Sequence, residues 1–86
     1  MSDLTQLKAQ LHAIASEARS TSGQLASFEN RFKRAIGEVE QRIGGSATGA
    51  DKQIIETLQG ASKAVKSASE ALAAAAKAAQ GYADSI

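Results

Sequence analysis

Apolar residues recur along this chain at alternating steps of three and four, the spacing of a helix that packs lengthwise on another helix. In the first half, the row is Leu4, Leu7, Leu11, Ile14, Ala18, Thr21, Leu25, Phe28, Phe32, Ile36, Val39 and Ile43. In the second half, it is Ile54, Leu58, Ala61, Val65, Ala68, Leu72, Ala75, Ala79, Tyr82 and Ile86. The first row breaks its alternation once, because two steps of four run from Phe28 to Ile36, which predicts a locally straighter helix there.

Residues 44–48 lack this periodicity and separate the two rows. Gly44 and Gly45 directly follow Ile43, and paired glycines suit a helix end because glycine takes the left-handed conformation without a Cβ clash. Two helices of similar length with a short connection favour an antiparallel hairpin. We therefore expect an all-α fold, with one helical-hairpin domain over residues 1–86 made of a helix at 3–43, a turn at 44–48 and a helix at 49–84.

The stretch Ser20-Thr21-Ser22-Gly23 is the weakest part of the first predicted helix. Glycine costs about 1 kcal/mol relative to alanine inside a helix, so a kink or a local opening is one interpretation. The other, which we favour, is a continuous helix whose small residues let a neighbour approach closely.

The second predicted helix carries too much apolar surface for one neighbour. Between Ala68 and Ala79 it is apolar on nearly all sides, and such a helix is normally buried on several. The hydrophobic fraction is 43%, but much of it is alanine, which buries little area and leaves a small chain with a thin core. We expect two hairpins to pair into a four-helix bundle, unless alanine serves only as a helix former on an exposed surface. The predicted core and interface residues are Leu25, Phe28, Phe32, Ile36, Val39, Leu58, Val65, Leu72 and Tyr82.

No group of residues in the sequence is suited to catalysis. The chain has no cysteine and one histidine, His12, which has no second ligand at metal-binding spacing and no serine–carboxylate set around it. The glycines of residues 44–49 lack the following Lys-Ser/Thr of a phosphate loop. We expect a protein that is not an enzyme and that uses no metal, cofactor or small-molecule substrate.

The charges are balanced. Ten basic and nine acidic residues leave a formal net charge of +1, which gives no electrostatic reason to expect a nucleic acid or an anionic membrane as partner. The densest basic cluster lies at residues 31–34, where Glu29–Lys33 and Arg34–Glu38 have the spacing of helical ion pairs. This pattern indicates a solvated helix face.

The N-terminal residues lack the basic start and the continuous apolar run of a signal peptide. No segment reaches the roughly 20 apolar residues of a membrane-spanning helix. We expect a protein that is cytoplasmic, or exported without a cleaved signal peptide, or both.

The layout resembles the small Trp-x-Gly helical-hairpin proteins of type VII secretion, the early-secreted-antigen-like family. Ile43-Gly44-Gly45 falls where the turn motif of that family would lie, with Ile43 in place of the Trp and Gly45 matching the Gly. The segment from Leu72 to Tyr82 is similar to the closing helix of the family. The resemblance covers the whole chain as a pattern and implies a homodimeric or heterodimeric four-helix bundle.

Two features depart from that family. The Trp is absent, and so is the export signal in which an acidic residue follows a Tyr by four positions, because Ile86 stands four positions after Tyr82. The resemblance implies that this chain is the partner without the signal, or an export adaptor for a larger toxin-type protein with a helical leader. The alternatives are an amphipathic membrane-surface protein, which an alanine-dominated face without Trp disfavours, and a structural coiled-coil scaffold.

Overall fold

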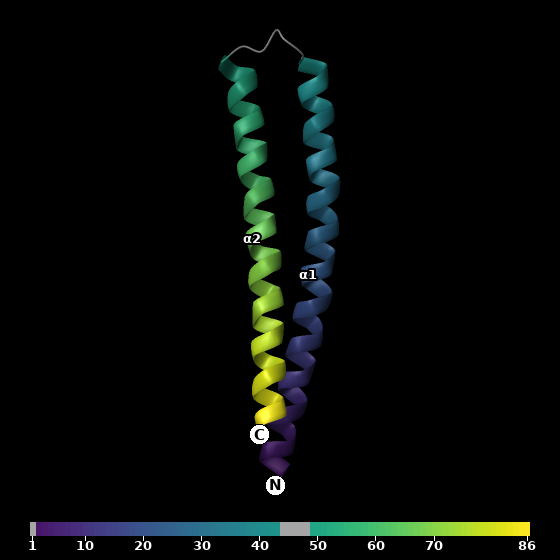
Figure 1. Ribbon diagram of the computed structural model, residues 1–86, viewed down its shortest axis with the longest axis vertical. Helices are drawn as coiled ribbons and strands as arrows, with labels where there is room; N and C mark the ends of the chain where they lie inside the picture. The colour runs from purple at the N-terminus through teal and green to yellow at the C-terminus, as the bar shows by residue number, and fades with distance from the viewer. Residues whose placement is uncertain (1, 44–48) are drawn as a thin grey trace.

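The computed structural model describes residues 2–43 and 49–86, which form two long helices, α1 (Ser2–Ile43) and α2 (Gly49–Ser85). The two helices run antiparallel and pack against each other along their length (Figure 1). The hairpin measures 67 × 17 × 14 Å. The predicted all-α hairpin is confirmed, and each helix ends within one residue of its predicted position. The predicted turn, with Gly44 and Gly45, lies outside the described residues.

Helix α1 is continuous through its weakest stretch. Residues 20–23 are helical without interruption, and a Cβ atom added to Gly23 would meet nothing within 4 Å. Gly23 therefore lies on the outer surface, whereas its neighbour Ser22 reaches α2 through hydrogen bonds to Ser69. The interpretation of a continuous helix with small residues toward its neighbour is confirmed.

The contact between α1 and α2, which we call the seam, follows a strict heptad. All the described buried or half-buried residues except Gln80 occupy heptad positions a and d, which alternate by three and four. Positions a are Lys8, Ala15, Ser22, Glu29, Ile36 and Ile43 in α1, and Ile55, Ser62, Ser69, Ala76 and Ala83 in α2. Positions d are Leu11, Ala18, Leu25, Phe32 and Val39 in α1, and Asp51, Leu58, Val65, Leu72, Ala79 and Ile86 in α2.

Several residues of each predicted row lie outside the seam. The residues Leu7, Ile14, Thr21 and Phe28 are exposed in α1, as are Ile54, Ala61, Ala68, Ala75 and Tyr82 in α2. In each case the residue one position later takes the place in the seam, for example Ala15 rather than Ile14. The predicted break between Phe28 and Ile36 disappears as well, because Glu29 occupies the seam and restores the alternation.

Small side chains explain why these neighbours occupy the seam. Ala15, Ala76 and Ala83 are between 0% and 1% exposed, and Cβ-sized groups let two helix backbones approach closely. The Ser22–Ser69 contact sets the register, so that Ala15 lies opposite Ala76 and, on the other side of that contact, Ile36 lies opposite Ile55. The a residues on the turn side of this contact, Ile36, Ile43 and Ile55, are larger than Ala15, Ala76 and Ala83 on the other side.

The alanine contact predicts a sharp difference between two identical substitutions. Ala15→Leu places three more carbon atoms where no space exists and should lower the free energy of unfolding by about 1–3 kcal/mol. Ala13→Leu, two residues away on the exposed surface of α1, should change it by less than about 0.5 kcal/mol. Urea unfolding followed by circular dichroism measures both values. Equal effects of the two substitutions would contradict the placement of Ala15 in the seam.

Candidate interaction surface

The hairpin has two unlike sides along its seam. Positions g precede each a residue, and positions e follow each d residue. Because the two helices run in opposite directions, the g residues of both lie on one side of the seam and the e residues of both lie on the other. The side formed by the g residues and the adjoining d residues is called the apolar side, and the side of the e residues and the adjoining a residues is called the polar side.

The apolar side carries no charge over most of its length. Its exposed g residues are Leu7, Ile14, Thr21, Phe28, Ala35 and the charged Arg42 from α1, and Ile54, Ala61, Ala68, Ala75 and Tyr82 from α2. Ile14, Ile54 and Tyr82 are 53%, 54% and 55% exposed. Single exposed apolar residues are ordinary on a soluble protein, but a contiguous apolar strip usually marks a contact surface.

The large residues of the seam also face the apolar side. Positions d hold Leu25, Phe32, Val39, Leu58, Val65 and Leu72, and all six are only half-buried. The Phe32 ring stacks on the exposed ring of Phe28, with centroids 5.6 Å apart and planes inclined by 15°. Within the described chain no large side chain is fully buried. The hairpin thus leaves most of its large apolar groups partly in contact with water.

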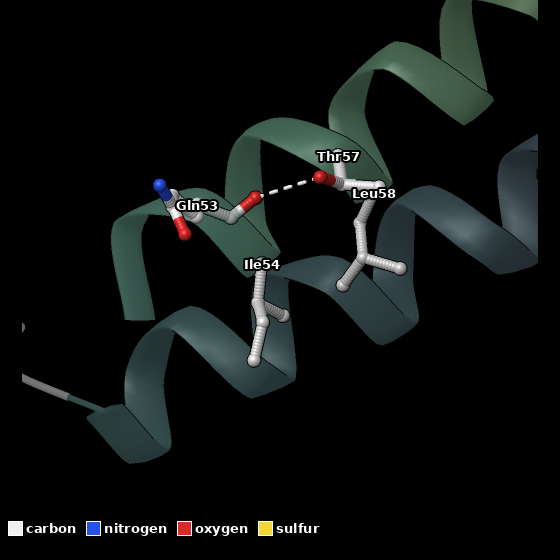
Figure 2. A pocket seen from close by; sticks show the side chains of 4 residues that line it. All are labelled: Gln53, Ile54, Thr57 and Leu58. Carbon is white, nitrogen blue, oxygen red and sulfur yellow. Dashed lines mark hydrogen bonds between the residues drawn. The ribbon is translucent and has the colours of Figure 1, made fainter. Parts of the chain in front are cut away.

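A hollow opens on this side near the turn end of α2. It has a volume of about 390 Å³ and is lined by Gln53, Ile54, Thr57 and Leu58. Figure 2 shows that the side chains of Ile54 and Leu58 extend in the same direction from consecutive turns. The hydroxyl of Thr57 donates to the Gln53 carbonyl oxygen at 2.8 Å (Figure 2), so it makes a bond within its own helix and the hollow keeps an apolar floor.

The polar side is built from charged and amide residues. Its exposed e residues include Arg19, Lys33, Glu40, Lys52 and Lys66. Of the two predicted ion pairs, Glu29–Lys33 is present, with Glu29 Oε2 2.7 Å from Lys33 Nζ. Glu29 is only 8% exposed because it occupies position a. A second hollow of about 280 Å³ lies beside this pair, lined by Lys33, Ile36, Glu40, Gln59, Ser62 and Lys63.

Two serines join the helices at the middle of the seam. Ser22 Oγ donates to the Ser69 carbonyl oxygen at 2.8 Å, and Ser69 Oγ donates to the Ser22 carbonyl oxygen at 2.9 Å. The two hydroxyl oxygens are 3.2 Å apart. Such reciprocal bonds to backbone carbonyls require closely spaced helices, so they fix both the distance and the register of α1 and α2.

The predicted core and interface residues fall into three groups. Ile36 is buried in the seam, at 5% exposed. The half-buried d residues include Leu25, Phe32, Val39, Leu58, Val65 and Leu72. Phe28 and Tyr82 are exposed and do not belong to the core of the hairpin; as contacts to a partner, all nine residues stay predictions. Ile43, predicted at the turn, is half-buried at the last residue of α1.

The structure adds polar seam residues that sequence reasoning missed, above all Ser22, Glu29, Ser62 and Ser69. Hydrophobicity does not identify them. The feature of the sequence that points to them is periodicity. In α1, the row that contains Ser22 and Glu29 alternates by three and four without a break, whereas the predicted apolar row does not.

Other chemistry is sparse in the described part of the chain. His12 is exposed on α1. Across residues 2–43 and 49–86, no group of three or more His, Cys, Asp or Glu side chains could hold a metal ion. Neither helix there has the length and apolar content needed to cross a membrane.

Comparison of the chain with protein-family models, with curated proteins and with solved structures gives no match.

The buried carboxylate of Glu29 offers a test of the polar half of the seam. Glu29→Leu removes a charge from an 8% exposed position and replaces it with an apolar side chain, while Lys33, whose side chain is 58% exposed, stays hydrated. We expect the free energy of unfolding to rise by about 1–2 kcal/mol. Glu70→Leu, on the exposed surface of α2, should change it by less than about 0.5 kcal/mol.

Chemical unfolding at low protein concentration gives these values. A loss of stability in Glu29→Leu would mean that the carboxylate stabilises the hairpin through its ion pair.

Proposed function

We propose that this chain is a non-enzymatic protein-interaction subunit, acting as a small helical-hairpin partner or export adaptor for a larger, toxin-type protein of type VII secretion. The observation that supports an interaction role is the apolar side. It runs along both helices, holds exposed Leu7, Ile14, Phe28, Ile54 and Tyr82, and leaves large d residues half-covered.

The secretion context is supported by the resemblance of the sequence and by the shape of the hairpin. Two helices of 42 and 37 residues, the Ile43-Gly44-Gly45 segment and the late Tyr82 form the pattern on which the resemblance depends. A helical leader of similar length could lie along the apolar side and bury its large residues.

A membrane-surface role is the competing proposal, because an apolar side could also face lipid. The residues that border the apolar side on α1 count against it, since the exposed c positions hold three acidic residues, Asp3, Glu17 and Glu38, and one basic residue, Arg31. Surface-binding helices instead place Lys and Arg beside their apolar face and anchor it with large aromatic residues. The alanines of α2 supply little area for insertion.

The proposal is tested by recovering the protein with its partners from the native cell and then measuring secretion with and without them. We expect a protein with a helical hairpin or a helical leader, held by a contact with low dependence on salt because most of the apolar side is uncharged. Recovery of lipid, of nucleic acid or of the chain alone would contradict the export role.

The missing export signal gives a second prediction. Ile86→Asp places an acidic residue four positions after Tyr82 at a half-buried site near the end of α2. If the chain is a partner without the signal, this substitution should allow its export when the signal-bearing partner is deleted. Ile86→Asn, which has a similar shape and no charge, should still require the partner.

Immunoblotting of culture supernatants measures both variants in the two backgrounds. Export of the unchanged chain without any partner, or no response to Ile86→Asp, would count against the type VII assignment.

A further inference from the structure

No further inference is drawn: the strongest candidate, the hollow of about 280 Å³ on the polar side between α1 and α2, carries nothing, because its Lys33 and Lys63 are balanced by Glu29 and Glu40, its buried Ser62 hydroxyl can bond to a carbonyl oxygen of its own helix, and nothing in the described residues shows what would fill it.

Discussion

The close approach of two helix backbones at the middle of the seam is the constraint on which the rest of the hairpin depends. Ser22 and Ser69 each bond to the backbone carbonyl of the other, which is possible only where both side chains are small. The neighbouring a position of α1 is Ala15, which is fully buried against α2. Around this contact the a positions hold small or polar residues, whereas Ile36, Ile43 and Ile55 occupy them nearer the turn, and most of the other large apolar residues lie at d and g. The closeness of the seam is therefore the reason that one side of the molecule is apolar.

The sequence is sufficient to predict the two helices, their ends and their antiparallel packing. It also identifies position d correctly, because Leu25, Phe32, Leu58 and Leu72 are large and lie at an unbroken period of seven. The prediction fails at most of the a positions, although it includes the a residues Ile36 and Ile43. There a larger apolar residue, such as Ile14 or Phe28, stands directly before the residue that packs, and hydrophobicity alone selects the larger one. The distance between the two helix backbones decides which of the two adjacent residues packs in the seam. That distance depends on both helices, so it cannot be read from one helix alone.

The wrong choice of residues at position a also shows which feature of the sequence points to the candidate surface. Two adjacent apolar rows on one helix cannot both face a single neighbouring helix. The two consecutive steps of four that end at Phe32 and Ile36 indicate that the predicted α1 row changes there from one such row to the other. When the two rows are separated, Leu7, Ile14 and Phe28 fall in the row that lies outside the seam, where they are exposed. What the sequence does not provide is the relation between the two helices. That relation puts Ile54 and Tyr82 of α2 on the same side as those residues of α1.

The polar groups in the seam have a further consequence for how the chain finds one alignment. A seam made only of alanine and leucine would repeat every seven residues, and α2 could slide along α1 by one repeat with little loss of apolar contact. Such a slide would move Ser69 away from Ser22 and place Glu29, whose carboxylate is paired with Lys33, against Ile55 or Ser69. Each misaligned state would break the reciprocal Ser22–Ser69 hydrogen bonds, and a hydroxyl group that is then buried without a partner costs about 1–3 kcal/mol. The Ser22–Ser69 bonds thus favour the observed alignment over others of similar apolar content, which keeps the ends of a rod 67 Å long at fixed positions.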